Sequence, residues 1–226
     1  MLTHISENIK GINARIKRAA FNSKRNPSKI TLLAATKTVP IETISKVYAC
    51  GIANFGENYV LEAGEKKKKL SNLYKKIKWH MIGHLQSNKV NKAVEIFDVI
   101  ESVDSVGLAE AIARKATTKP VTIMLEINIS LESSKFGFYP KDLHHVYKKL
   151  KSLPELCITG LMTIAPQVSD PEKVRPFFRH LRKLKDELGL SELSMGMTND
   201  FEIAIQEGAT IIRLGRTLFG PRPFVI

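Results

Sequence analysis

Short apolar runs alternate with helical patterns along almost the whole chain. The strand candidates are residues 30–36, 52–56, 77–82, 99–103, 121–128, 157–164, 193–196 and 211–215. Helical patterns lie between them at residues 42–50, 59–70, 87–96, 106–116, 140–153, 171–188 and 200–207, and an amphipathic helix precedes them at about 5–21. Strands separated by helices of this length are joined by right-handed crossovers in a parallel sheet. The pattern therefore predicts an α/β protein, a (β/α)8 barrel of the TIM type with an extra N-terminal helix.

An open, doubly wound sheet is the alternative arrangement of the same elements. It is disfavoured because no G-x-G-x-x-G turn follows any strand candidate. The chain has 226 residues and no Pro-rich or Ser/Gly-rich linker, so we predict a single domain over residues 1–226. One helix has clear end signals, with Asp170 as N-cap, Pro171 at the first helical position and Gly189 at the end.

The two cysteines indicate the cellular compartment. Cys50 and Cys157 are far apart and lack the spacing of a metal site, so we expect reduced core residues of a cytoplasmic protein. The first residues contain no apolar leader, and no later stretch has the length of a membrane span. These features predict a non-exported, soluble protein.

The formal net charge of +13 raises the question of a polyanionic partner. Lysine and arginine are densest at residues 66–69, 148–151 and 179–185, all within helical patterns. Leucines recur there at helical spacing, so we expect these basic residues to form solvated outer faces. No aromatic residues for base stacking are interleaved with them, and no nucleic-acid motif is present. A specific nucleic-acid function is therefore not favoured.

Lys37 ends the first strand candidate, the apolar run ITLLAAT. Side chains alternate along a strand, so Leu33, Ala35 and Lys37 share one face. A poorly hydrated lysine has a lowered pKa, and its neutral amine can form an imine with an aldehyde. The alternative is a strand-end lysine that simply extends into water.

Other unusual residues fall at the same end of the predicted barrel, where the active sites of this fold lie. The segment 194–198 ends the seventh strand and leads into a helix, and its small residues and backbone N–H groups could bind an anion. Arg213 shares a strand face with Ile211 and Gly215. If that face is the barrel interior, Arg213 needs an acceptor, and an ion pair with a carboxylate such as Glu126 is the alternative to a functional role.

Six segments at these positions carry a family resemblance. They are residues 35–40 (ATKTVP), 55–60 (FGENYV), 79–89 (WHMIGHLQSNK), 160–164 (GLMTI), 194–197 (SMGM) and 212–215 (IRLG). Each is short, but their order and spacing together are highly specific. Over essentially its whole length the chain resembles the YggS/PROSC family of pyridoxal 5'-phosphate (PLP) homeostasis proteins, which are related to the N-terminal domain of alanine racemase.

The resemblance implies a PLP barrel of fold type III with PLP held as a Schiff base on Lys37. It also implies that Arg213 faces the pyridine nitrogen. Around the phosphate it places Ser194, Met195, Gly196, Gly215 and Arg216. Arg216 stands where the family more often has threonine, so it either adds a charge to the phosphate site or turns outward. Thr198, Asn199 and Asp200 replace the usual serine-containing turn.

Several further residues have two possible interpretations. Asn58 and His84 lie beside the cofactor ring or cap the helices that follow them. His80 and His84 would share a strand face, but no third ligand is evident, so we predict no metal site. Lys135 aligns with a further lysine of the family and is either a second PLP contact or, as we favour, a surface residue.

The resemblance predicts a protein of intracellular vitamin B6 homeostasis that binds PLP without robust catalysis. Apo-forms of PLP enzymes are the candidate acceptors, and we expect a monomer without membrane or specific nucleic-acid partners. A PLP-dependent amino-acid racemase is the alternative. Racemisation needs a second acid/base opposite the lysine, which alanine racemase takes from a further C-terminal domain, and this sequence ends at Ile226 directly after the predicted barrel.

Overall fold

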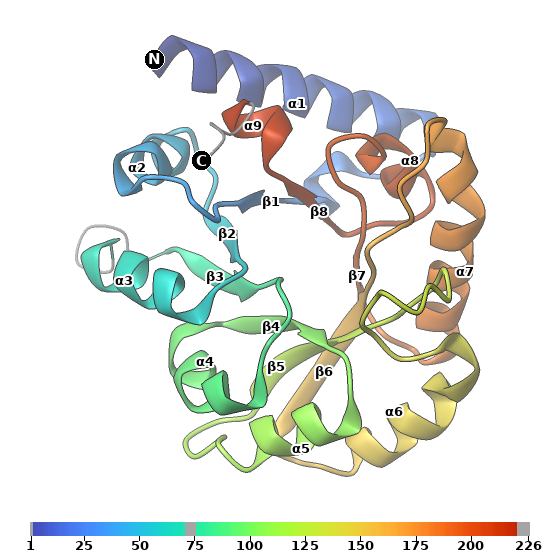
Figure 1. Ribbon diagram of the computed structural model, residues 1–226. Coiled ribbons are helices and arrows are strands. Elements are labelled where there is room, and N and C mark those ends of the chain that lie inside the picture. Colours follow the sequence, from blue (N-terminus) through green and yellow to red (C-terminus); the bar gives the residue numbers. More distant parts are fainter. Residues whose placement is uncertain (1, 71–75, 221–226) are drawn as a thin grey trace.

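A closed parallel barrel forms the centre of the molecule. The computed structural model describes residues 2–70 and 76–220, and within these ranges the strands pair in the order β1 to β8, with β8 closing onto β1 (Figure 1). The strands are β1 (Thr31–Ala35), β2 (Asn54–Glu57), β3 (Lys78–Met81), β4 (Val99–Val103), β5 (Val121–Glu126), β6 (Leu156–Met162), β7 (Glu192–Ser194) and β8 (Ile211–Leu214). The predicted (β/α)8 barrel is confirmed.

Helices surround the barrel on its outer side (Figure 1). They are α2 (Ile41–Ala49), α3 (Val60–Leu70), α4 (Val90–Ile96), α5 (Val106–Ala113), α6 (Leu143–Lys151), α7 (Arg175–Glu187), α8 (Phe201–Gln206) and α9 (Arg216–Phe219). Short 3-10 turns occur at Pro27–Lys29, Ser87–Lys89, Pro140–Asp142 and Pro171–Val174. None of the helices in the described ranges is long and apolar enough to cross a membrane.

The extra N-terminal helix α1 (Leu2–Asn22) packs against α8 and α9. Arg15 forms a bidentate ion pair with Glu202 of α8, at 3.2 and 2.8 Å. The Asn8 side chain donates a hydrogen bond to the Leu218 carbonyl of α9 at 3.0 Å. These contacts tie the first element of the chain to the last helices.

Two hydrophobic clusters follow from the alternation of side chains along the strands. The smaller cluster lies inside the barrel and contains Leu33, Met124, Met162 and Ile211. The larger one lies between the strands and the helices and contains Ala34 next to Leu33 in sequence. The predicted two faces of β1 are thus confirmed, because consecutive residues belong to different clusters.

The helix signals near Asp170 are also confirmed, with one refinement. The Asp170 side chain accepts a hydrogen bond from the Glu172 N–H at 3.0 Å, and Gly189 adopts a φ of 65° after the helix. The first turn, however, is the 3-10 segment Pro171–Val174, and α7 begins at Arg175.

The expectation that the cysteines belong to the core is wrong. Both thiols are free, and both residues are exposed. Cys50 is the C-cap of α2, and Cys157 lies at the start of β6, paired with Thr122. Both positions are at element ends, where the covering helices and loops leave the side chains open to solvent.

Candidate functional site at the barrel mouth

A cavity of about 700 Å³ opens at the carboxyl ends of the strands. Its lining comes from the segments that follow β1, β2, β3, β6, β7 and β8, so residues distant in sequence meet there. Five predicted site residues line it: Lys37, Asn58, Arg213, Gly215 and Arg216. The volume lies in the range typical of small-molecule sites.

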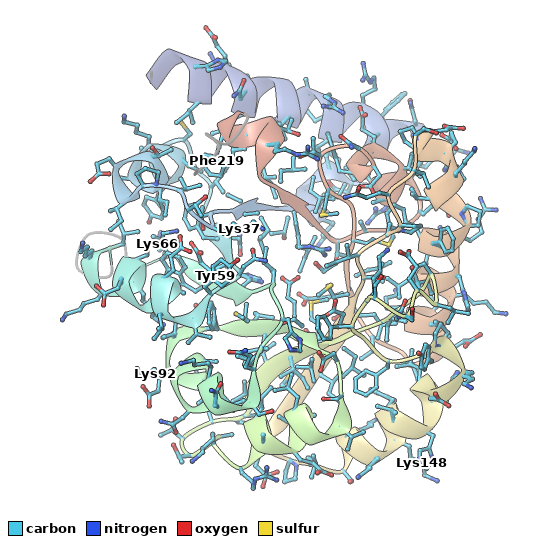
Figure 2. The ribbon with its side chains drawn as sticks, in the orientation of Figure 1. Lys37, Tyr59, Lys66, Lys92, Lys148 and Phe219 are labelled. Atoms are coloured by element: carbon cyan, nitrogen blue, oxygen red, sulfur yellow. The ribbon has the colours of Figure 1, made fainter. Side chains whose placement is uncertain are left out.

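Lys37 lies two residues beyond the end of β1 (Figure 2). Ala35 and Lys37 both line the cavity, and Leu33 below them belongs to the cluster inside the barrel. The side chains of these three residues therefore follow the predicted common face. The apolar strand brings the amine of Lys37 to the mouth of the barrel.

Arg213 is a buried cation in β8, with 5% of its surface exposed. Its Nη1 donates to Ser194 Oγ at 2.7 Å, and its Nη2 donates to the Thr163 carbonyl at 2.8 Å. Burial lowers the pKa of Arg213, and the carboxylates of Glu101, Glu126 and Asp200 oppose that change. Neutral acceptors thus hold the guanidinium, in place of the alternative of a direct ion pair with Glu126.

A buried chain of hydrogen bonds continues behind Arg213. Ser194 Oγ donates to Glu101 Oε2 at 2.6 Å, and Glu101 Oε1 lies 2.7 Å from His80 Nδ1. Burial would raise the Glu101 pKa, but His80, Arg213 and Ser194 outweigh it and hold that pKa below its ordinary value. The result is an ionised carboxylate that orients Ser194 and balances the charge of Arg213.

The end of β7 and the loop after it contain both buried residues and residues that line the cavity. Ser194 is fully buried in the chain of hydrogen bonds, and the Met195 N–H donates to the Ile211 carbonyl at 3.1 Å. Gly196 has a φ of 91°, and a Cβ there would lie 2.5 Å from Ala204 Cβ. These three residues lie behind the cavity wall, whereas Met197, Thr198 and Asn199 line the cavity. Their predicted phosphate contacts stay predictions.

Asp200 stabilises the turn of residues 197–200 through its side chain. Its Oδ1 accepts a hydrogen bond from the Met197 N–H at 2.6 Å. Burial raises the Asp200 pKa, partly offset by that N–H and by Arg213. The carboxylate therefore fixes the loop that supplies one wall of the cavity.

His84 lies outside the cavity lining. Its Nδ1 is 2.9 Å from Asp104 Oδ2, and its ring stacks on Phe136 with 3.8 Å between centroids. His80 is buried and paired with Glu101. No group of three or more His, Cys, Asp or Glu side chains that could hold a metal ion occurs in residues 2–70 and 76–220.

Lys135 reaches toward the rim of the cavity from the loop after β5. Its Nζ donates to Glu132 Oε1 at 2.7 Å and to the Ile164 carbonyl at 3.3 Å. Ile164 lines the cavity and Lys135 does not. The side chain is thus a neighbour of the site, tied to an acidic partner.

Glu126 is a buried carboxyl near the mouth whose pKa is raised. It ends β5 on the interior face, and 7% of its surface is exposed. Burial, and next the charge of Asp104, raise the Glu126 pKa to about 7, while Arg213 acts in the opposite direction.

One prediction about surface charge is wrong. Lys66 belongs to the basic run 66–69 that was expected to be solvated, yet only 5% of its surface is exposed. The sequence does indicate that Lys66 is buried. It lies at helical spacing from the apolar residues of α3 that are also buried, which are Val60, Ala63 and Leu70. Lys68 and Lys69 are exposed as expected.

The family model for the alanine racemase N-terminal domain matches residues 2–223. A pyridoxal phosphate homeostasis protein from Aquifex aeolicus is 40% identical over 226 residues, which cover 96% of this chain and 98% of that protein. The protein of the same description from Homo sapiens is 36% identical and is covered over 86% of its length.

Solved structures agree with these matches. PipY from Synechococcus elongatus, solved with PLP bound, superposes with a TM-score of 0.83 at 36% identity, covering 96% of this chain and 100% of PipY. Alanine racemase from Corynebacterium glutamicum gives a TM-score of 0.71 at 17% identity, over 62% of that chain, which is evidence for a shared fold alone. The chain therefore belongs to the family of pyridoxal phosphate homeostasis proteins, built on the fold of the alanine racemase N-terminal domain.

Proposed function

We propose that this protein binds PLP in the barrel-mouth cavity and serves intracellular PLP homeostasis. The single observation that carries the proposal is the convergence of Lys37 and Arg213 on one cavity, in a chain that is 36% identical to a relative solved with PLP bound. In the proposed linkage, the neutral amine of Lys37 condenses with the cofactor aldehyde. A C=N bond replaces the C=O bond and water leaves, so no oxidant or reductant is needed.

The residues present fit such a cofactor. A guanidinium has five N–H donors, and Ser194 and Thr163 take two of those of Arg213. The remaining donors suit an unprotonated pyridine nitrogen, which agrees with the predicted role of Arg213. Ile82 and Ile164 supply apolar walls for the ring. When bound, PLP supplies an electrophilic aldehyde and an electron-withdrawing ring.

For the phosphate we propose the part of the cavity wall that follows β7 and β8. Gly215 and Arg216 follow β8 there, and residues 197–199 belong to the loop after β7. Arg216 gives this wall a cation that can pair with a phosphate oxygen. Asn58 is the proposed polar neighbour of the ring. The predicted cofactor contacts of His84, Ser194, Met195 and Gly196 remain part of the proposal.

The cavity chemistry favours binding over catalysis. Among the described residues that line it, the ionisable ones are Lys37, Asp200, Arg213 and Arg216. Asp200 is tied to the Met197 N–H, and an arginine is a poor proton carrier because it stays charged. Racemisation requires proton transfer on both faces of a substrate carbanion, and this lining offers Lys37 alone as an effective proton-transfer group. We therefore propose a carrier in place of a racemase.

The proposal also covers the partners of the protein, which are acceptor enzymes, further copies of the chain and nucleic acid. Lys148, which belongs to the basic run 148–151, lies on the outward face of α6, as expected for a solvated basic helix (Figure 2). Lys92 lies likewise on the outward face of α4 (Figure 2). We propose that acceptors are apo-forms of PLP enzymes, that the protein acts as a cytoplasmic monomer, and that nucleic acid is attracted only non-specifically.

The test is reduction of the purified protein with borohydride after PLP is added. We expect a visible imine absorbance before reduction and a pyridoxyl adduct on Lys37 in the digested protein afterwards. Absence of any imine absorbance at saturating PLP would overturn the proposal.

A further inference from the structure

Lys66 carries a buried ammonium behind the strand that presents Lys37. Three acceptors surround its Nζ: the Thr36 carbonyl at 2.7 Å, Glu57 Oε1 at 2.7 Å and Glu62 Oε1 at 2.6 Å. Lys66 lies on α3 (Figure 2). Glu57 ends β2 and Thr36 follows β1 directly, so the cluster joins a helix to the ends of two strands. None of these side chains lines the cavity.

The cluster holds the backbone on both sides of Lys37. On one side, the Thr36 carbonyl accepts from Lys66 and the Thr36 hydroxyl donates to Glu57 Oε1 at 2.7 Å. On the other side, the Thr38 N–H donates to Glu62 Oε1 at 2.6 Å. Residues 36 and 38 are therefore anchored to the same ammonium and its two carboxylates, with Lys37 between them.

The backbone at this point needs such an anchor. Thr38 has a φ of 64°, in the left-handed region that β-branched residues rarely adopt. Strained conformations of this kind persist only where surrounding contacts enforce them. Two contacts hold the backbone here: the Thr38 N–H donates to Glu62 Oε1, and the Val39 N–H donates to the Thr36 carbonyl at 2.9 Å. The first of them comes from the Lys66 cluster.

Fold stability alone is a poor explanation for the cluster. The Glu57 side chain is fully buried, and its Oε2 has no hydrogen-bond partner among the residues that the structure describes. Burial raises the Glu57 pKa, against the hydrogen bonds from Lys66 and Thr36. Apolar residues of similar size often stabilise a protein as well as a buried ion pair does. Apolar residues could not replace the charged groups in one respect. The charged groups hold specific backbone atoms next to Lys37, namely the Thr36 carbonyl and the Thr38 N–H.

We propose that Lys66 is a positioning residue for Lys37. By holding Thr36 directly and Thr38 through Glu62, it keeps the backbone of the β1 end in the one conformation that directs the Lys37 amine into the cavity. This inference rests on the proposed Schiff-base function of Lys37 and adds the group that prepares it. Misplacement of a reacting group by about 1 Å can cost on the order of 100-fold in rate.

The experiment compares two ligands on the full-length protein. PLP reports both binding and imine formation, whereas pyridoxine 5'-phosphate lacks the aldehyde and reports the ring and phosphate site alone. We expect Lys66→Met to slow imine formation by about tenfold or more while the affinity for pyridoxine 5'-phosphate stays within about twofold of wild type.

Lys69→Met is the matched control. It removes the same charge three residues further along α3, from an exposed position. We expect wild-type imine formation in this variant. An equal effect of Lys69→Met would show that the net charge of the helix matters and would overturn the proposal.

Two further variants keep the test valid if Lys66→Met fails to fold. Lys66→Met with Glu57→Gln removes the uncompensated carboxylate, and Glu62→Gln weakens the acceptor for Thr38 at a half-buried position. We expect slow imine formation in both, with the smaller effect in Glu62→Gln.

The outcomes separate positioning from charge balance and from the proposed function. Full recovery of imine formation in the double variant would mean that Lys66 only balances Glu57, which overturns the proposal. A parallel loss of pyridoxine 5'-phosphate affinity would show a general disturbance of the site, which also overturns it. If wild-type protein forms no imine, the proposed function fails and this inference fails with it, whereas a wild-type imine with an unaffected Lys66→Met protein refutes the inference alone.

Discussion

Arg213 and Glu101 face each other across the barrel through the hydroxyl of Ser194. The hydroxyl accepts from Arg213 Nη1 at 2.7 Å and donates to Glu101 Oε2 at 2.6 Å. One small side chain thus satisfies a buried cation and a buried anion at once. The guanidinium is held at a fixed place below the cavity, with further donors left for a ligand.

Ser194→Ala should therefore be costly although it removes one atom. The Arg213 N–H and the Glu101 oxygen would both lose their partner, and we expect the free energy of unfolding to fall by about 1–3 kcal/mol. Urea denaturation measures the change. Ser191→Ala is the control, since the exposed Ser191 hydroxyl makes a longer bond of 3.2 Å to the Thr159 carbonyl, and equal losses in the two variants would contradict the bridging role.

Lys37→Ala should abolish the imine absorbance, because the amine that condenses with the aldehyde is gone. Residual PLP would still bind through the proposed contacts of Arg213, Gly215 and Arg216. Absorbance spectra and mass mapping after borohydride reduction measure both effects. Lys92→Ala, which removes an exposed lysine of α4, should behave as wild type. An undiminished absorbance in Lys37→Ala, with the adduct on another lysine, would refute the assignment.

Glu126 should make the protein less stable as the pH rises from about 5 to 8. Its pKa is about 7 in the fold against an ordinary value of 4.5, so the folded state binds the extra proton in this window. The stabilisation from the protonated Glu126 carboxyl is complete at pH values below its pKa in the unfolded chain. It is lost as the pH rises through its pKa in the folded protein. We expect a loss of up to about 3 kcal/mol.

Glu126→Gln isolates this contribution, since the amide keeps the shape of the protonated acid without titrating. Denaturation of both proteins between pH 5 and 8 should give a stability difference in favour of the variant that grows with pH. A difference that stays constant across this range would mean that Glu126 does not titrate there.

Racemisation and transamination of common amino acids should be very slow. A positioned proton donor is typically worth on the order of 10²–10⁴ in rate, and the described cavity lining lacks a second one opposite Lys37. Incubation with alanine and serine followed by chiral chromatography measures turnover. Sustained turnover that is lost in Lys37→Ala would make the protein an enzyme.

The fold was predictable because the hydrophobic pattern is local and repeats eight times. A run such as residues 30–36 shows its strand character by itself, and strand alternation correctly placed Lys37 and Arg213 on faces that meet at the mouth. Element ends were less certain. The predicted strands 121–128 and 157–164 end in the structure at Glu126 and Met162. Of the two segments that follow, the one after Met162 lines the mouth.

Long-range polar pairing was beyond the sequence. The pairing of Glu101 with Ser194 and His80 joins β3, β4 and β7, and no local pattern shows which carboxylate meets which donor. Lys66 was missed for a different reason. A charged residue is ordinarily predicted to be exposed, even where its helical position faces the core. Lys66 is nevertheless buried, because two carboxylates and a carbonyl surround its ammonium.

The two exposed thiols offer attachment sites at the end of the barrel opposite the cavity. Cys157 lies at the amino end of β6, and Cys50 ends α2 just before the chain enters β2, so both face away from the end where the cavity opens. A maleimide dye or a surface linker on either thiol would leave the mouth turned toward the solution. Exchange of a small ligand or docking of another protein could then be followed on a single oriented, tethered molecule without touching the residues that bind.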